Sequence, residues 1–282
     1  MARALIAALA IVLATVAATL NVPAAVAAQQ PAPAASGSQP SPYSDAEAER
    51  RLLDMANRER AKAGLPPLQM DDGLAQAARQ HGAAMAAQRK LSHQLSGEPS
   101  LAHRLAANTK TQLDQEGENV AFAGSLDQAQ DSLMHSPPHR ANLLNAGYNV
   151  AGFSVVRSGS LLYVTQDFGH SLPRHSNQEA EVLVGRAVDG IRAQGRLPAL
   201  QRMDREPAAA SACAMAEADS LRAPAPAARV VLRYTTAQPQ TLPANASQVI
   251  SDRSVGSFAA GACFARSRTY PTGVYWVTLL FY

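Results

Sequence analysis

Residues 136–144 read Ser-Pro-Pro-His-Arg-Ala-Asn-Leu-Leu, and this stretch carries the clearest local structural signal in the chain. Proline fits the first turn of a helix, where its missing N–H is not needed, and serine is preferred just before that turn. We therefore expect a helix that is capped by Ser136 and holds His139 rigidly in its first turn. Ser136 and His139 could instead act as nucleophile and base. A capping serine has its hydroxyl bonded to backbone amides, however, and the chain has no Gly-x-Ser-x-Gly turn, so we do not expect a serine hydrolase.

Two further polar residues precede this helix, His93 in Leu-Ser-His and Glu118 in Gly-Glu-Asn-Val-Ala. The separations are 25 residues (118 − 93) and 21 residues (139 − 118), so only the fold could bring the three together. Two imidazoles and a carboxylate suit zinc, with the fourth position left for water. We predict a metal site formed by His93, Glu118 and His139, with Ser136 and His135 in the same cleft. The alternative for His93 is a solvated surface histidine, and Glu118 is expected at the entrance of a helix or turn.

The N-terminus predicts export from the cell. An apolar run follows Arg3, and Ala25-Val-Ala27 resembles a cleavage site, so residues 1–28 are predicted to be a secretory signal peptide. An uncleaved membrane anchor is the alternative, but the run is shorter than the about 20 residues that a spanning helix needs. Residues 29–43 are rich in Pro, Ser and Gln and predict a flexible linker. We expect a secreted or periplasmic protein without a transmembrane segment after cleavage.

Charge and cysteine content narrow the class of protein further. A formal net charge of +3 and the lack of an arginine-rich stripe argue against a nucleic-acid partner. The two cysteines, Cys213 and Cys263, are an even pair, and in an exported protein they most simply form one disulfide. We expect it to join a helix at Cys213 to a strand at Cys263. Two free buried thiols are the alternative.

The chain contains an apparent internal repeat. A shift of 132 residues aligns residues 44–72 with residues 176–204 without a gap, and 11 of the 29 pairs are identical. Both segments begin with Ser-x-x-Glu, which caps a helix, and both contain Leu-Pro-x-Leu-Gln, whose proline ends that helix. A second helix is expected after Asp72 and after Asp204, each a possible N-cap.

Each copy is also predicted to close with a hairpin of two strands. Tyr-Val-Thr-Gln-Asp-Phe at residues 163–168 resembles Trp-Val-Thr-Leu-Leu-Phe at residues 276–281, and both are rich in β-branched and aromatic residues. A further strand is expected before each, at residues 149–156 and 259–266. The second copy has no histidine after His175 and therefore lacks the predicted metal site, so we expect it to have a packing or partner-binding role.

An ordered set of motifs in residues 44–169 resembles the CAP superfamily of cysteine-rich secretory, antigen 5 and plant pathogenesis-related proteins, in its compact bacterial form. The motifs are Asn57-x-x-Arg60, Gly64-Leu-Pro-Pro-Leu68, Leu74-x-x-x-Ala78-x-x-His81-x-x-x-Met85, Leu91-Ser-His93, Gly117-Glu-Asn-Val-Ala121, the stretch at residues 136–144, and Tyr163-Val-Thr-Gln-Asp-Phe-Gly169.

The resemblance implies an α+β fold, with an α-β-α sandwich CAP domain at residues 44–170 and a smaller, degenerate CAP-like domain at residues 171–282. Family members carry two histidines and two acidic residues in a central cleft, which can hold a divalent metal. His93, Glu118 and His139 match three of the four, and a serine at or near Ser136 replaces the remaining acid. The loss of one carboxylate makes the site less suited to calcium, which takes many oxygen ligands, and favours zinc.

From the resemblance we expect a non-catalytic binding protein. Its cleft would hold a divalent metal, with zinc as the cofactor, and a small-molecule, lipid, sterol-type or envelope ligand. A zinc-dependent hydrolase that uses a metal-bound water is one alternative. A purely structural or interaction module, stabilised by hydrogen bonds within the polar cluster, is another.

Overall fold

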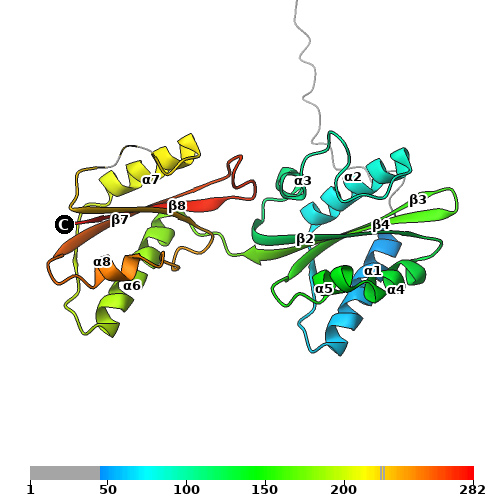
Figure 1. Ribbon diagram of the computed structural model, residues 1–282, viewed down its shortest axis with the longest axis horizontal. Helices are drawn as coiled ribbons and strands as arrows, with labels where there is room; N and C mark the ends of the chain where they lie inside the picture. Colours follow the sequence, from blue (N-terminus) through cyan, green and yellow to red (C-terminus); the bar gives the residue numbers. More distant parts are fainter. Residues whose placement is uncertain (1–44, 223, 225) are drawn as a thin grey trace, which may run out of the picture. The chain divides into compact units, whose positions relative to one another are not determined.

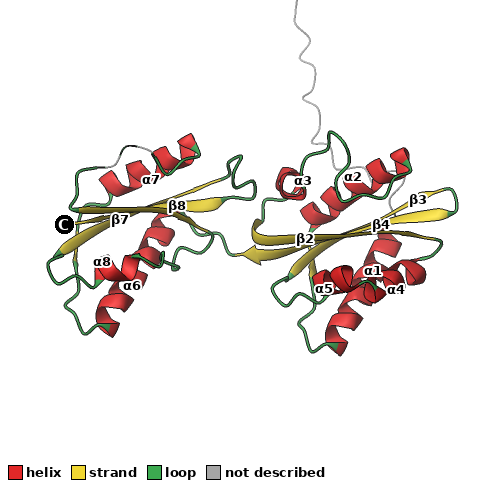
Figure 2. Ribbon diagram, in the orientation of Figure 1, coloured by secondary structure: helices red, strands yellow, loops and turns green. Residues whose placement is uncertain are grey.

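A computed structural model describes residues 45–222, 224 and 226–282 (Figure 1). The predicted signal peptide, residues 1–28, and the predicted linker, residues 29–43, lie outside the described residues. The described chain forms two four-stranded sheets, and each sheet has helices on both faces (Figure 2). None of the described helices combines the length and the apolar character that a membrane span requires.

The first sheet has the strand order β1-β3-β4-β2, which puts β2 at one edge. Its strands are β1 (Gln69–Met70), β2 (Gln112–Ala123), β3 (Val150–Ser158) and β4 (Leu161–Leu172). β1 pairs with β3 in parallel, and the two longer pairings, β3 with β4 and β4 with β2, are antiparallel. The β3–β4 hairpin is the one predicted from the sequence, and Gly159 makes its turn with a positive φ of 62°.

Helices cover both faces of this sheet and complete the α-β-α sandwich (Figure 1). One face carries α1 (Ala46–Lys62), α4 (Leu126–His135) and α5 (Pro137–Leu143), and the other carries α2 (Asp72–Gln88) and α3 (Leu101–Asn108). Helix α2 packs against β3 so closely that only glycine fits at position 152. A Cβ atom on Gly152 would lie 2.0 Å from backbone atoms of Leu74 and Ala75. The four residues named in the Leu74 to Met85 motif are all buried in α2, including His81.

The ends of the helices follow the sequence signals with three corrections, the first of which is that the helix expected after Asp204 begins at Glu206, with Arg205 at its N-cap and no side-chain capping bond. Ser176 forms the predicted capping box with Glu179. Helix α1, however, is capped by Asp45, whose side chain accepts from the Ala48 amide, and helix α2 is capped by Asp71 rather than Asp72. In α1 and α2, the capping residue is the aspartate whose carboxylate accepts from the backbone amide three residues later in the chain.

The second sheet repeats the arrangement of the first, with the order β5-β7-β8-β6. Its strands are β5 (Gln201–Arg202), β6 (Val230–Thr236), β7 (Ser257–Ala265) and β8 (Val274–Phe281), and its helices are α6 (Asn177–Gln194), α7 (Glu206–Ala218) and α8 (Ala246–Ile250). The predicted disulfide is present: Cys213 in α7 is bonded to Cys263 in β7.

A buried arginine makes the same contacts in each half. In the first half, Arg60 Nε donates to the carbonyl of Pro66, and its Nη1 donates to the carbonyls of Leu143 and Asn145. In the second half, Arg192 uses the same atoms to reach the carbonyls of three corresponding residues, Pro198, Ile250 and Asp252. These shared bonds make α8 the structural counterpart of α5.

One sequence expectation about the site is wrong. Glu118 does not lie at the entrance of a helix or turn; it lies within β2, opposite Asp167 of β4. The strand was not predicted because its residues Asp114 to Glu118 are nearly all polar, without the alternation typical of a half-buried strand. A central position in β2 fixes the Glu118 backbone through the ladder of β4, which a loop would not do.

Candidate functional site

Two histidines meet at the free edge of β2. His93 comes from the loop between α2 and α3, on one side of the sheet, and His139 comes from the first turn of α5, on the other. Their ring centroids lie 6.1 Å apart. His93 Nδ1 lies 2.9 Å from Glu118 Oε1, and His139 Nδ1 lies 2.9 Å from Ser136 Oγ. Neither Nε2 atom is hydrogen-bonded to any residue that the structure describes, so both remain available to a ligand.

Ser136 does not act as the sequence predicted. It occupies the N-cap position of α5, but its side chain makes no capping bond to the helix amides. Pro137 and Pro138 fill the first two positions and have no N–H, which leaves the His139 amide as the only usual capping donor. The hydroxyl instead bonds to the His139 ring and fixes the orientation of that ring.

Two asparagines attach α5 to the edge of β2. Asn119 Nδ2 donates to the carbonyl of His139 at 2.9 Å, and Asn142 Nδ2 donates to the carbonyl of Glu118 at 3.1 Å. The two side chains also bond to each other, from Asn142 Nδ2 to Asn119 Oδ1 at 3.1 Å. His139 is thereby held beside the strand that carries Glu118.

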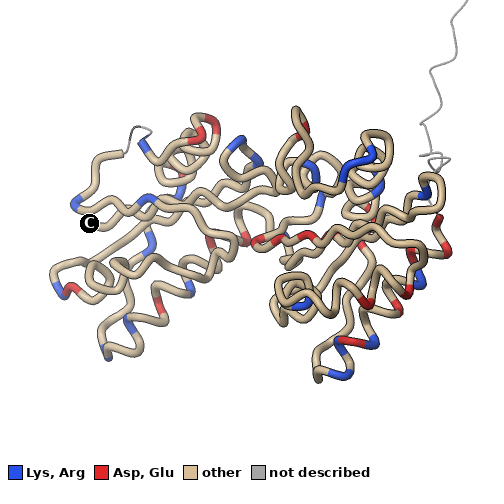
Figure 3. Tube along the Cα trace, turned by 45° about the vertical axis from the view of Figure 1, so that its right-hand side comes forward, with Lys and Arg blue, Asp and Glu red and all other residues tan. Residues whose placement is uncertain are grey.

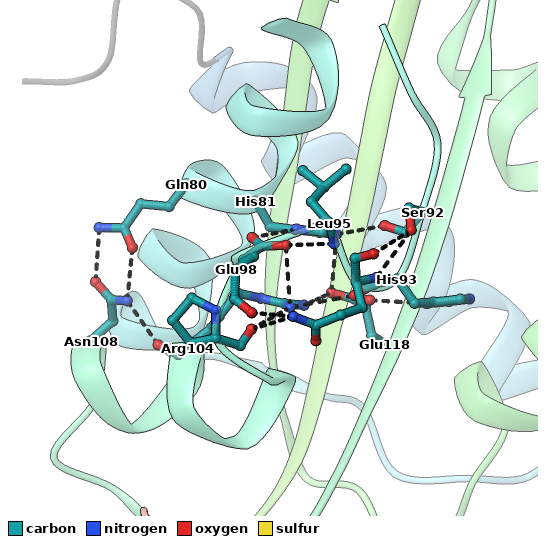
Figure 4. A network of polar contacts seen from close by, with 11 residues as sticks. Gln80, His81, Ser92, His93, Leu95, Glu98, Arg104, Asn108 and Glu118 are labelled. Atoms are coloured by element: carbon teal, nitrogen blue, oxygen red, sulfur yellow. Dashed lines mark hydrogen bonds and ion pairs between the residues drawn. The ribbon is translucent and has the colours of Figure 1, made fainter. Parts of the chain in front are cut away.

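Glu118 is the centre of a buried polar cluster that also contains His81, Glu98 and Arg104 (Figure 4). Its side chain is only 4% exposed, and its second oxygen, Oε2, accepts from Arg104 Nη2. Arg104 also donates through Nη1 to the carbonyls of His93 and Pro99. One guanidinium therefore neutralises Glu118 and supports the backbone of His93 at the same time.

His81 connects this cluster to α2. The ring is fully buried, with Nδ1 2.7 Å from Glu98 Oε1 and Nε2 2.9 Å from the Ser92 carbonyl. Both ring nitrogens face oxygen acceptors, so a proton must lie on each nitrogen or one must be shared with the Glu98 carboxyl group. His81 therefore fixes the two ends of the loop that carries His93, as a structural residue of the site.

Asp167 lies beside Glu118 in the sheet and is fully buried. Neither of its carboxyl oxygens has a hydrogen-bond partner among the described residues. Burial, and then the neighbouring charge of Glu118, raises the pKa of Asp167 well above its ordinary value. Asp167 is consequently held in its neutral form, which keeps two adjacent carboxylates from repelling each other.

This raised pKa predicts a pH-dependent effect of the substitution Asp167→Asn. The folded state favours protonated Asp167, so its contribution to stability is complete below the ordinary aspartate pKa and is lost as the pH rises. The Asn variant lacks this loss, and each unit of pKa shift is worth about 1.4 kcal/mol. We expect it to match the wild type in urea unfolding near pH 4 and to be more stable at pH 7.5. The exposed Asp54→Asn serves as the control, and a difference independent of pH would contradict the assignment.

Other residues considered from the sequence are not part of this group. The side chain of His135 is 78% exposed, and its Nδ1 contacts Asp131 within its own helix, α4. Basic and acidic positions are spread over the helices and strands of each half, as Figure 3 shows. Among the described residues, no set of three or more His, Cys, Asp or Glu side chains has an arrangement that could hold a metal ion.

Burial also shifts the pKa of one of the two edge histidines. Desolvation, and then the nearby His93, lowers the pKa of His139 below its ordinary value. A neutral imidazole has a free lone pair on one nitrogen, and here the unbonded nitrogen is Nε2. The neutral His139 ring can therefore offer the lone pair of Nε2 to a ligand such as a metal ion.

The second sheet has apolar residues where the first has this cluster. Tyr163 and Trp276 occupy corresponding positions in β4 and β8, which makes Leu280 the counterpart of Asp167 and its cross-strand partner Val231 the counterpart of Glu118. Ala246, four residues before Ile250, takes the place of His139. Val231 and Leu280 pack in a small apolar cluster with Ala208 and Ala259. The same arrangement of strands therefore forms without any of these charges.

Comparison with known proteins identifies the first half. Residues 53–168 match the cysteine-rich secretory protein family, CAP. With the α-β-α sandwich and the ordered motifs, this part of the chain is a CAP domain.

Two similar proteins come from Bacillus subtilis (strain 168). The uncharacterized protein YkwD is 32% identical over 124 residues, which are 43% of this chain and 46% of YkwD. The uncharacterized membrane protein YlbC is 34% identical over 122 residues, 43% of this chain and 34% of YlbC. The chain thus spans less than half the length of these curated relatives.

A solved structure, an extracellular protein containing a SCP domain from Bacillus anthracis str. Ames, is 27% identical to this chain. The match has a TM-score of 0.41 and covers 44% of this chain and 40% of that one.

The sequence missed Arg104 and Asp167 as parts of the site. Arg104 lies in Leu-Ala-His-Arg-Leu, an ordinary amphipathic segment in which an arginine is expected to face solvent. Asp167 did carry a signal, because it is an acidic residue in a strand whose neighbours are otherwise uncharged and mostly apolar. A buried acid in such a strand requires a neutral form or a charged partner.

Proposed function

We propose that this chain is an exported CAP-domain protein that binds a divalent metal ion, zinc by preference, through Nε2 of His93 and Nε2 of His139. The observation that carries the proposal is that each ring is fixed through Nδ1 while its Nε2 has no partner among the described residues. Metal-binding histidines commonly use one nitrogen for the metal and the other for a carboxylate or hydroxyl group that orients the ring. Water or a group from a bound molecule would complete the coordination.

The distance between the rings suits a shared metal ion. A tetrahedral zinc ion about 2.1 Å from each Nε2 places the two ring centroids roughly 5.3 Å apart, so the two rings, 6.1 Å apart here, would need to approach by less than about 1 Å. Glu118 supports the metal indirectly in this proposal, since its two oxygens are bonded to His93 and Arg104. This differs from the sequence prediction, in which Glu118 was a third ligand.

The engagement of Glu118 also favours a binding role over hydrolysis. A zinc hydrolase needs a base close to the metal-bound water, and Glu118 is the nearest candidate by sequence. Here both oxygens of that carboxylate are already engaged, one by the His93 ring and the other by a buried arginine. We therefore propose a non-catalytic site that presents a metal to a small-molecule, lipid or envelope ligand.

The second half supports a functional reason for these polar residues. Val231, Leu280 and Ala246 stand where the first half has Glu118, Asp167 and His139, and the sheet forms nonetheless. Well-packed apolar residues commonly equal or exceed a buried ion pair in stability. The charges of the first half are therefore not required by the fold. We propose that the second half is a degenerate copy that has kept the scaffold and lost the site.

Export is supported by the disulfide between Cys213 and Cys263. Structural disulfides persist in oxidising compartments and are rare in the cytosol. Together with the predicted signal peptide, this bond favours a secreted or periplasmic location.

Zinc titration of the purified full chain, without an affinity tag that contains histidine, tests the metal site. We expect one zinc ion per chain, and we expect His93→Ala or His139→Ala to weaken binding by at least about tenfold. Glu118→Gln should weaken it by about 10–100-fold, the usual cost of losing a group that orients a ligand. The control is His135→Ala, which removes an exposed imidazole bonded only within α4.

Wild-type affinity in both His93→Ala and His139→Ala would overturn the proposal. Circular dichroism of each variant must show the native helix content, so that lost binding is not mistaken for lost structure. If Glu118→Gln abolished binding as completely as both histidine substitutions together, Glu118 would be a direct ligand instead.

A further inference from the structure

An open groove lies in the first half where the β3–β4 hairpin meets the C-terminal end of α2. It has a volume of about 400 Å³ and is lined by Arg89, Leu91, Phe122, Tyr163 and the hairpin turn at residues 158–161. Leu91 and Leu161 are each 37% exposed and Phe122 is 51% exposed. We call this site the Phe122 groove. Three large apolar side chains around one pocket leave a surface that water solvates poorly.

The second half contains the corresponding place, and there it is filled. Tyr163 in the first half and Trp276 in the second occupy the same position: each packs on a Met-Ala pair of the covering helix, Met85-Ala86 or Met215-Ala216. Each also faces an edge-strand residue in register, Phe122 for Tyr163 and Thr235 for Trp276. The two aromatic residues thus form the floor of equivalent sites.

A tyrosine of the second half's own hairpin occupies its site. The connection from β7 to β8 runs through residues 266–273, whereas β3 and β4 are joined by only Gly159 and Ser160. Tyr270 in the longer connection packs edge-on against Trp276, with ring centroids 5.6 Å apart, and its hydroxyl lies 2.9 Å from Thr235 Oγ1. The shorter hairpin cannot supply such a residue, so the Phe122 groove stays open.

The charge at the rim differs between the two sites. Helices α2 and α7 both end in a residue with left-handed backbone, Arg89 (φ 50°) and Asp219 (φ 46°), and the capping bonds are the same. Asp219 accepts hydrogen bonds from Ser267 Oγ at 2.6 Å and Thr269 Oγ1 at 2.8 Å, which anchors the connection that carries Tyr270. Arg89 takes its place in the first half, and its guanidinium makes no hydrogen bond or ion pair with any described residue. An occupant of the Phe122 groove would therefore meet a cation where Tyr270's segment meets an anion.

We propose that the Phe122 groove binds a peptide segment of a partner protein that presents an aromatic side chain one to three residues after an acidic one. The aromatic ring would pack on Tyr163 beside Phe122, whose own ring lies 6.4 Å from that of Tyr163 between centroids, as Tyr270 packs on Trp276, and the acidic side chain would pair with Arg89. The spacing follows from the second half, where the groups that bond to Asp219 come from Ser267 and Thr269, three residues and one residue before Tyr270. This role is independent of the proposed metal site.

A labelled pentapeptide can test the proposal by fluorescence anisotropy with the full chain. The probe is Asp-Ala-Glu-Tyr-Pro, blocked at both ends, and the matched peptides are Ser-Ala-Thr-Tyr-Pro, without acids, and Asp-Ala-Glu-Ala-Pro, without the ring. We expect the probe to bind with a Kd of about 1 mM or lower. Its affinity should be at least about tenfold higher than that of either matched peptide. The titration is done with a chelator present, so that the metal site plays no part.

Two substitutions locate the binding in the groove. Arg89→Asp introduces the residue that the second half carries at the equivalent left-handed position, Asp219, so the backbone should tolerate it. The variant should bind the probe about tenfold more weakly and lose the preference for the acidic peptides. Phe122→Ala should weaken every tyrosine peptide. The control is Arg196→Asp, which removes an arginine in the same left-handed conformation (φ 51°) but away from the groove.

Equal binding of the three peptides, or an unchanged affinity in Arg89→Asp, would overturn the proposal. So would competition by free 4-hydroxyphenylacetate at the same concentration as the peptide, because the groove would then be a site for small aromatic acids.

Discussion

Replacement of Arg104 by methionine should lower the free energy of unfolding by about 3–5 kcal/mol, the usual cost of removing one partner from a buried ion pair. Methionine fits the volume of the arginine stem but leaves the Glu118 carboxylate, 4% exposed, without its cation. It also removes the donors to the carbonyls of His93 and Pro99. Urea unfolding followed by far-UV circular dichroism would measure the loss.

A double substitution separates charge burial from simple loss of packing. Glu118→Val in the Arg104→Met background removes the stranded carboxylate and introduces the residue found at the corresponding position, Val231. We expect the double variant to recover about half or more of the lost stability. Arg140→Met, an exposed arginine in α5, should have little effect. A double variant less stable than Arg104→Met alone would show that the pair itself stabilises the fold.

Replacement of both Cys213 and Cys263 by alanine should lower stability by roughly 4 kcal/mol. The disulfide closes a loop with a sequence separation of 50, and a loop of that size restricts the unfolded chain by about this amount in the chain-entropy estimate. Trp276 is the chain's single tryptophan and packs in the same apolar cluster as Cys263. Its fluorescence therefore reports unfolding of the second half, where the loss should be seen.

The wild-type protein under reducing conditions provides the comparison for this variant. A reductant should shift the fluorescence transition of the wild type to that of the double alanine variant and should not move the variant itself. An unchanged transition in reduced wild type would mean that the bond contributes nothing to stability.

Local signals in the sequence were sufficient for much of the fold. Ser176 with Glu179 marked a helix start, Gly159 marked a hairpin turn, and the even pair of cysteines indicated the disulfide. Each of these signals depends on residues close together in the chain, or on the number of cysteines. The α-β-α sandwich came from the family resemblance, which summarises many such signals in a fixed order.

The candidate site was harder to predict because its contacts join distant segments. The sequence did single out His93, Glu118 and His139, and the structure brings the two rings within 6.1 Å. It gave no sign that Arg104 would occupy one oxygen of Glu118, since 14 residues separate them and an arginine on a short helix is normally solvated. Ser136 differs from the expected capping serine, since two of the first three residues of α5 are prolines without an N–H and its hydroxyl bonds to the His139 ring.

The edge position of β2 has a consequence for how these molecules behave at high concentration. An edge strand with unpaired backbone groups is a template on which a strand of another molecule can add, which leads to aggregation. In β2 the carbonyl of Glu116 accepts from the Tyr148 hydroxyl at 3.1 Å, and the carbonyl of Glu118 accepts from Asn142 Nδ2 at the same distance. Side chains from α5 and the loop after it thus occupy two of the carbonyls with which an added strand would pair. The segment that positions His139 therefore also obstructs edge-to-edge pairing at the middle of β2.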